Sequence, residues 1–179
     1  SETGVVINEF LANPTDNPAA AHYNPLQRET ASASNRIGTE DEYIELLNLG
    51  PGVVDLQGWT FSDAVAVRHT FGPFDFIPPS GSFVLYGGRL SGSVPRLDRR
   101  IPATFANGGA SGLALNNNGD DLVLRNARGQ MVARVVYSAA LVHAEGSVTR
   151  VPDGAGELMP HFSSTGLSVS PGLSATGGF

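Results

Sequence analysis

Apolar residues in this chain come in short, often β-branched runs, and glycine or proline closes each run before a helix could complete three turns. Nowhere do apolar residues recur at positions i, i+3, i+4 and i+7 over that length, as they do in an amphipathic helix. The 22 glycines and 12 prolines supply the interruptions, while 41% of the residues are hydrophobic and can form a core. The sequence therefore predicts an all-β fold of short strands and many turns.

We expect about eight or nine strands in an antiparallel, immunoglobulin-like β-sandwich with long irregular loops. Asn118-Gly119 and the turn at Ala127-Arg128-Gly129 separate three of the strands, which predicts a meander of two consecutive hairpins. The expected strands lie at residues 5–11, 41–48, 53–61, 67–71, 83–86, 113–115, 122–124, 132–137 and 147–151.

The chain reads as a single domain over residues 1–179, with a core at about 5–152 and a Ser/Gly-rich C-terminal extension at 153–179. Residues 14–39 and 87–112 show no sustained periodicity, and loops of that length are usually functional or disordered. Trp59 is the only tryptophan, and we expect it in the sandwich core rather than on a ligand platform. The other expected core residues are Ile44, Leu46, Leu122 and Leu124.

Composition excludes several classes of function. The chain has no cysteine, so it can form neither a disulfide nor a thiolate site. All eleven basic residues are arginines, which excludes a P-loop lysine or a Schiff-base lysine. The formal net charge of −6 argues against a nucleic-acid partner, because phosphate binding needs a basic face. No run of 18 apolar residues occurs, so we expect no transmembrane segment.

Five sequence segments, in their order along the chain, resemble the lamin tail domain family over roughly residues 5–172. The first three correspond to the opening strands of that family, and the last two resemble its middle and late segments. They are Val6-Ile7-Asn8-Glu9-Phe10, Asp41-Glu42-Tyr43-Ile44-Glu45-Leu46-Leu47-Asn48, Val54-Asp55-Leu56-Gln57-Gly58-Trp59-Thr60-Phe61-Ser62-Asp63, Ile77-Pro78-Pro79-Ser80-Gly81-Ser82-Phe83-Val84-Leu85 and Leu115-Asn116-Asn117-Asn118-Gly119-Asp120-Asp121-Leu122-Val123-Leu124.

This resemblance implies an immunoglobulin-like sandwich without an activity of its own. Bacterial domains of this type look like accessory or surface modules of exported proteins, often beside hydrolases or nucleases. Many of them carry an Asp-x-Asn-x-Asp-Gly calcium loop between the first two strands. Here that region reads Asn13-Pro14-Thr15-Asp16-Asn17-Pro18 and lacks the full spacing, so the resemblance does not by itself bring calcium to this chain.

The best metal candidates are the carboxylates Glu9, Asp16, Asp41 and Glu45, since calcium prefers several carboxylate and carbonyl oxygens. Strand alternation places Glu42 on the face opposite Glu45, so these two cannot share one site. The alternative is that Glu9 and Glu45 are paired or hydrogen-bonded structural carboxylates and that the other acidic residues face solvent. No cofactor other than calcium is expected.

The residues do not assemble into an active site, and we expect no enzyme. Paired carboxylates could serve a glycosidase, but neither a matched pair on one face nor an aromatic sugar platform accompanies them. The Gly-x-Ser-x-Gly motif of a nucleophile elbow is missing. The four histidines have no metal-binding spacing and lie at His22, His69, His143 and His161.

Charged loops are the candidate partner-binding sites. Arginines at 89, 96, 99 and 100 form the only basic concentration in an acidic chain, and they could meet phosphate, acidic polysaccharide or carboxylates, or simply face solvent. We hypothesise that the acidic segment with Glu40 and Glu42 in one copy faces Arg89, Arg96, Arg99 and Arg100 of the next. Such a head-to-tail contact builds open filaments. A terminal segment docked on a neighbouring sheet edge is another route to assembly.

The function expected from the sequence is that of a non-catalytic structural or interaction module, self-associating as a homo-oligomer or polymer such as a filament or surface-layer subunit. The alternative is a calcium- or glycan-binding accessory module of a secreted hydrolase. The first residue is serine rather than methionine, consistent with a removed signal peptide or with trimming. We therefore expect an extracellular or cell-surface location, with possible polysaccharide contact.

Overall fold

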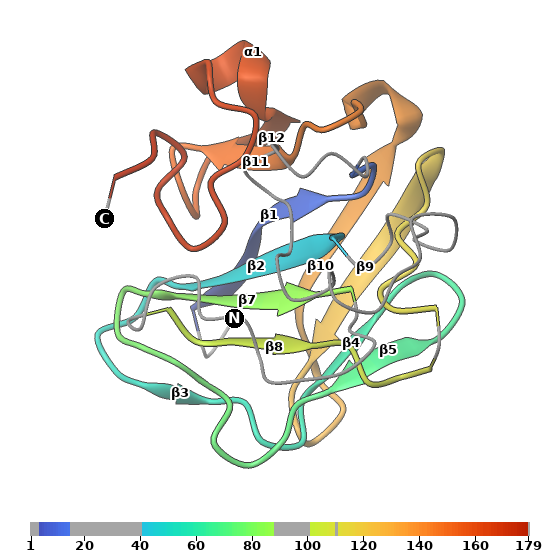
Figure 1. The fold of residues 1–179 in the computed structure, drawn as a ribbon. Coiled ribbons are helices and arrows are strands. Elements are labelled where there is room, and N and C mark those ends of the chain that lie inside the picture. Colours follow the sequence, from blue (N-terminus) through green and yellow to red (C-terminus); the bar gives the residue numbers. More distant parts are fainter. Residues whose placement is uncertain (1–3, 15–40, 88–100, 110, 179) are drawn as a thin grey trace, which may run out of the picture.

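The computed structural model describes residues 4–14, 41–87, 101–109 and 111–178. Two β-sheets pack face to face, and a two-stranded sheet of β3 (Val54–Asp55) and β6 (Phe76–Ile77) lies at one end (Figure 1). Among the described residues, the helical segments are η2 (Ala139–Leu141) and α1 (His161–Thr165), and neither is long and apolar enough to cross a membrane. The predicted all-β sandwich is confirmed.

The larger sheet has six strands in the order β12-β11-β1-β2-β7-β8. Neighbouring strands run antiparallel except β7 and β8, which pair in parallel. This pair departs from the antiparallel sandwich that the sequence predicts. The strands are β1 (Val5–Leu11), β2 (Tyr43–Asn48), β7 (Ser82–Tyr86), β8 (Ala103–Phe105), β11 (Val148–Val151) and β12 (Glu157–Pro160).

The smaller sheet has the order β10-β9-β4-β5 and is antiparallel throughout. Its strands are β4 (Thr60–Ser62), β5 (Val67–Thr70), β9 (Gly119–Arg125) and β10 (Met131–Ser138). The turn between β9 and β10 is held by Asn126, whose side-chain oxygen accepts the N–H groups of Arg128 and Gln130 at 3.0 Å each. This hairpin is the second one of the predicted meander.

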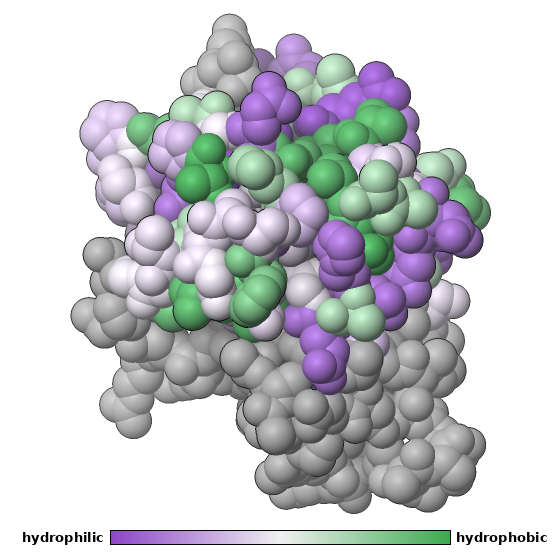
Figure 2. Space-filling view, turned by 90° about the horizontal axis from the view of Figure 1, so that it is seen from above, coloured by the Kyte–Doolittle hydropathy of each residue, from purple (hydrophilic) through white to green (hydrophobic). Residues whose placement is uncertain are grey.

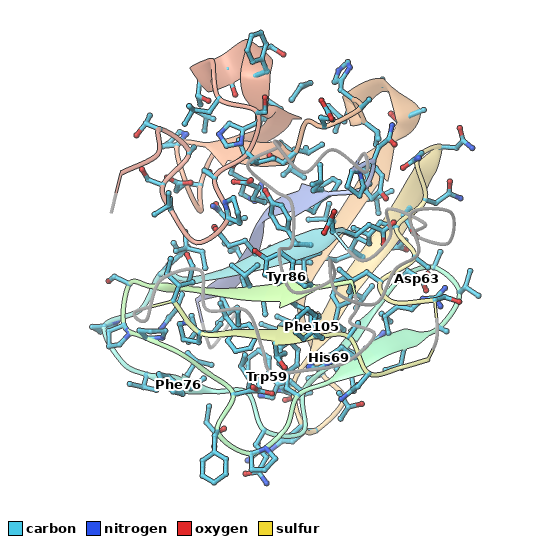
Figure 3. The ribbon with its side chains drawn as sticks, in the orientation of Figure 1. Trp59, Asp63, His69, Phe76, Tyr86 and Phe105 are labelled. Atoms are coloured by element: carbon cyan, nitrogen blue, oxygen red, sulfur yellow. The ribbon has the colours of Figure 1, made fainter. Side chains whose placement is uncertain are left out.

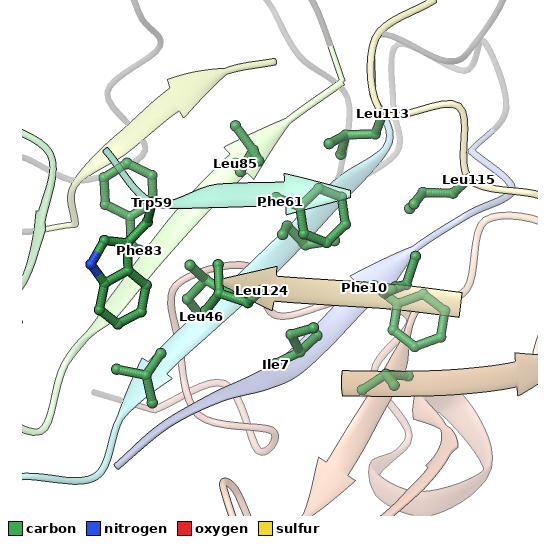
Figure 4. Close-up of a cluster of buried hydrophobic side chains, with 14 of the residues drawn as sticks. Ile7, Phe10, Leu46, Trp59, Phe61, Phe83, Leu85, Leu113, Leu115 and Leu124 are labelled. Atoms are coloured by element: carbon green, nitrogen blue, oxygen red, sulfur yellow. The ribbon is translucent and has the colours of Figure 1, made fainter. Parts of the chain in front are cut away.

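The main core fills the space between the two sheets because alternate residues of each strand point into it. Figure 4 shows Ile7, Leu46, Phe61 and Leu124 converging from β1, β2, β4 and β9. The structure places all five expected core residues in this cluster: Trp59, Ile44, Leu46, Leu122 and Leu124.

The outer face of the six-stranded sheet is also buried. A β-bulge in β1 between Ile7 and Glu9 reverses the alternation, so that Glu9 and Leu11 point away from the main core. A second apolar cluster lies on this face, and residues 166–178 cover part of it (Figure 1). The buried members of that cluster are Leu11, Tyr43, Val84, Tyr86, Phe105 and Val169.

Two sequence expectations about strand positions are corrected. Residues 113–115 form turns rather than a strand, although Leu113 and Leu115 are buried in the main core. The predicted extension at 153–179 contributes β12 and α1 to the fold over its described part. A run of apolar residues indicates that the segment is buried, and a buried loop can have the same run of apolar residues as a buried strand.

Candidate functional site

Two buried glutamates lie next to each other on the outer face of the six-stranded sheet. Glu9 of β1 and Glu45 of β2 are directly opposite in the antiparallel register, and neither side chain is exposed to solvent. Like charges in directly opposite positions destabilise a sheet, and burial increases the cost. The surroundings of these two carboxyl groups must therefore compensate the charge or remove it.

Glu9 is compensated by hydrogen-bond donors and by a histidine. The N–H and hydroxyl groups of Ser170 donate to its two oxygens at 2.9 and 2.6 Å, and the Tyr43 hydroxyl donates to it as well. Nδ1 of His161 lies 3.5 Å from the carboxylate. Burial alone would raise the pKa of Glu9, but the bonds from His161, Ser170 and Tyr43 together lower it. Glu9 is therefore ionised.

His161 supplies the matching positive charge when its ring is protonated. Burial would lower its pKa, but the hydrogen bond and the negative charge of Glu9 outweigh burial and raise the pKa above its ordinary value. Both ring nitrogens are in use, with Nε2 donating to the carbonyl oxygen of Ala175 at 2.8 Å and Nδ1 lying 2.9 Å from the hydroxyl oxygen of Ser147. The imidazolium thus connects the sheet to residue 175.

Glu45 is neutral at moderate pH. Burial and the adjacent charge of Glu9 raise the pKa of Glu45 to about 8. Its oxygens accept the side-chain amide of Asn8 at 2.9 Å and the backbone N–H of Gly172 at 2.6 Å. One carboxyl group of the opposed pair is therefore ionised and the other is protonated, which avoids like-charge repulsion.

A third carboxylate completes the set. Asp153 accepts the N–H of Ala175 at 3.0 Å, and Asn8 donates to Asp153 at 3.0 Å as well as to Glu45. We call Glu9, Glu45 and Asp153 the carboxylate cradle and residues 167–178 the tail segment. The cradle accepts backbone N–H groups at positions 170, 172 and 175 of the tail segment and so holds it against the sheet.

The predicted metal site is assembled only in part. The structure brings Glu9 and Glu45 together, but both bind the tail segment, while Asp41 is buried separately and Asp16 lies outside the described residues. Across the described ranges, no three His, Asp or Glu side chains are arranged to hold a metal ion. The interpretation of Glu9 and Glu45 as hydrogen-bonded structural carboxylates fits this geometry.

Most of the predicted partner-binding residues lie outside the described residues, namely Glu40, Arg89, Arg96, Arg99 and Arg100. Glu42 is described, and its side chain does not face solvent as expected: it is only 3% exposed and accepts the N–H of Leu115 at 3.2 Å. Burial raises the pKa of Glu42 to about 8. A contact between the acidic segment and the arginine loop of another copy therefore cannot use Glu42 in this conformation.

His69 is a buried polar residue that the sequence left without a role. It lies on β5 (Figure 3), is 2% exposed and packs edge-to-face on Phe71 at 4.5 Å between ring centroids. Neither ring nitrogen has a hydrogen-bond partner among the residues that the structure describes. Burial lowers the pKa of His69 to about 4 from 6.5. The imidazole is therefore neutral in the folded protein at pH 7.

We predict that His69→Leu stabilises the protein by about 1 kcal/mol at pH 7, because an unsatisfied buried polar group is removed. The gain should grow by about 2 kcal/mol on lowering the pH from 6.5 to 4, because the unfolded chain protonates His69 there and the folded protein does not. Urea unfolding at several pH values measures both effects. A pH profile unchanged by the substitution would contradict the buried neutral imidazole.

Sequence reasoning missed the residues that complete the cradle: Asn8, Ser147, Asp153, His161 and Ser170. They lie far apart in the sequence, and none belongs to a motif with a characteristic spacing. The available signal was a single polar pair, Asn8-Glu9, inside an otherwise apolar run. A carboxylate inside a buried strand requires a partner, although the pattern does not say which one.

The sequence of this chain matches the family profile described as Lamin Tail Domain over residues 1–139. A search of curated protein sequences found no significant match. The matched range ends just after β10, so it contains Glu9 and Glu45 but not Asp153, His161 or the tail segment. Since the match covers well over half of the chain and the structure is an immunoglobulin-like sandwich, the chain belongs to the lamin tail domain family of non-catalytic interaction domains.

Proposed function

We propose that this domain is a self-associating interaction module that pairs with a second copy through the edge strand β10. The supporting observation is that β10 is a long edge strand with an unpaired side. It spans eight residues and is hydrogen-bonded to β9. Within the described part of the chain, no backbone hydrogen bond joins its other side to any residue. Such an edge can accept another strand.

The side chains of β10 favour a protein partner. Val136 is 63% exposed and Met131 is 56% exposed, so apolar surface lies along the open edge. Arg134 forms a bidentate pair with Asp121, at 2.9 and 2.8 Å, on the neighbouring strand. Its charge is already matched, so an approaching strand need not supply a carboxylate.

The other edges are less suitable for strand addition. The outer side of β5 is occupied: Asn107 exchanges two hydrogen bonds with the backbone of Thr70, and the N–H of Gly108 donates to the carbonyl of Arg68 at 2.8 Å. A Cβ at position 108 would lie 2.5 Å from the Val67 carbonyl oxygen, so only glycine permits this close approach. The edge strands β8 and β12 have three and four residues, and β12 ends in proline.

The simplest partner for the open edge of β10 is the same strand of a second copy. Two β10 strands can pair antiparallel about a twofold axis, which places Val136 of both copies near the interface and forms one continuous sheet. That contact closes to a dimer. A filament or surface layer would need an additional contact between dimers, and an extracellular or cell-surface location remains part of this proposal, as the family resemblance implies.

We predict that Val136→Lys abolishes dimer formation while it leaves the fold intact, because a lysine on an edge strand opposes pairing with another edge. Light scattering after size-exclusion chromatography, from micromolar to millimolar protein, measures the mass. Val65→Lys is the matched control, since Val65 is 84% exposed in the loop between β4 and β5. A monomeric wild type at all concentrations, or an equal effect of both substitutions, would contradict the proposal.

A further inference from the structure

The tail segment is held mainly through its backbone. Three of its N–H groups donate to the carboxylate cradle, and the Ser168 carbonyl accepts the N–H of Ser147 at 2.9 Å. Two of its apolar side chains are buried, Val169 and Ala175. These contacts depend on the backbone path of the segment, which turns at residues 171–172 and 175–176, more than on the identity of its side chains.

Gly172 fixes that path at one point. Its φ of +77° belongs to the left-handed region that glycine favours, and a Cβ there would lie 2.6 Å from Cδ1 of Ile101. Any larger residue would push the segment away from Glu45, whose carboxyl group accepts the Gly172 N–H. The cradle is therefore selective for a segment with glycine two residues after the serine that binds Glu9.

The tail segment is attached to the sandwich by the cradle bonds and by Val169, which packs in the apolar cluster of the outer face, rather than by sheet pairing. It belongs to no strand of either sheet, and it follows Gly166, which ends α1 in a left-handed conformation with open space where a Cβ would lie. Beside it lies a pocket of about 540 Å³, lined among others by Leu47, Asp153 and Leu173. Figure 2 looks down on this end of the molecule, where hydrophobic patches alternate with hydrophilic ones.

The cradle without the tail segment would be less stable than the cradle with it. Glu9 would lose both Ser170 donors, and His161 would lose the Ala175 carbonyl, so these polar groups would need new hydrogen-bond partners. These groups can be satisfied by any chain that presents the same backbone pattern. The sequence that does so is the tail segment itself, and a second copy carries an identical one.

From these contacts we propose that the carboxylate cradle is a peptide-binding site that also accepts the tail segment of a second copy. In an isolated molecule its own tail competes, at an effective concentration of about 1 mM for a short linker. Exchange between copies then needs a high protein concentration or a weakened internal contact. One-way exchange links copies head to tail, while reciprocal exchange closes a dimer. This site is separate from β10.

The test uses the full chain with Gly172→Val, which disrupts its own tail segment but leaves the cradle residues unchanged. A fluorescent peptide of residues 166–178 is titrated in, and binding is followed by anisotropy. We expect saturable binding that is at least tenfold tighter than to the wild type, because the competing tail no longer occupies the cradle. The same peptide with Gly172→Val should bind at least tenfold more weakly.

Two further measurements keep the outcome decisive. Circular dichroism checks that the variant is folded, and a full chain with Ser170→Pro replaces it if it is not, since proline removes the N–H that binds Glu9. Repeating the titration in a chain that also carries Val136→Lys separates this site from the edge strand, and the affinity should not change. Absence of saturable binding, or equal binding of both peptides, would overturn the proposal.

Discussion

The Glu42→Gln variant should be more stable than the wild type at pH 8 by about 4 kcal/mol, and the difference should vanish near pH 4.5. The carboxyl group of Glu42 has a pKa of about 8 in the folded protein against 4.5 in the unfolded chain. The unfolded chain therefore ionises first as the pH rises. The wild type loses stability between these two values, whereas glutamine has no proton to release.

Glutamine suits this position because its amide oxygen can accept the N–H of Leu115, as the glutamate does. Urea unfolding of both proteins from pH 4.5 to 8 measures the effect. Glu157→Gln is the control for charge removal, since Glu157 lies exposed on β12. A stability difference that is independent of pH, or a control that behaves like Glu42→Gln, would show that Glu42 ionises normally in the folded protein.

The Glu9→Ala variant should lose about 3–5 kcal/mol of unfolding free energy at pH 6, because breaking a buried ion pair leaves the remaining charge unpaired. That charge is on His161, and the donors of Ser170 and Tyr43 also lose their acceptor. Since Ser170 belongs to the tail segment, residues 167–178 should become sensitive to protease before the sheets unfold.

Chemical unfolding and limited proteolysis with mass spectrometry measure the two consequences of this change. Ser170→Ala is the matched control, because it removes one hydroxyl donor and should cost about 1 kcal/mol. A loss below 1 kcal/mol for Glu9→Ala, or a tail segment that stays resistant to protease, would mean that the cradle does not hold the tail.

The same buried carboxyl groups explain why the cradle prefers moderate pH. Glu9 has a lowered pKa, so its contribution is present above 4.5 and is lost as the pH falls through its folded-state pKa. His161 has a raised pKa, so its contribution is present below 6.5 and is lost as the pH rises through its folded-state pKa. Both contributions are therefore fully present between pH 4.5 and pH 6.5 and decline on either side of this range.

The strands and the core follow from local pattern. Residues 5–11 and 43–48 form strands because β-branched and apolar residues fit a half-buried pleated surface, and the glycines and prolines after them end the pairing. The hairpin of β9 and β10 follows from its turn residues. The same reasoning failed at 113–115, where two buried leucines lie in a turn, since burial does not fix the backbone conformation.

Neighbouring residues alone predict a sandwich of short strands, because alternation and turn chemistry are local features of the sequence. Three features follow from the folded structure alone: Glu9 meets Glu45, Glu42 is buried, and the tail segment closes over the outer face. Those contacts depend on strand register and on a bulge, and they join residues up to 161 positions apart. No local pattern encodes which distant donor will satisfy a buried carboxylate.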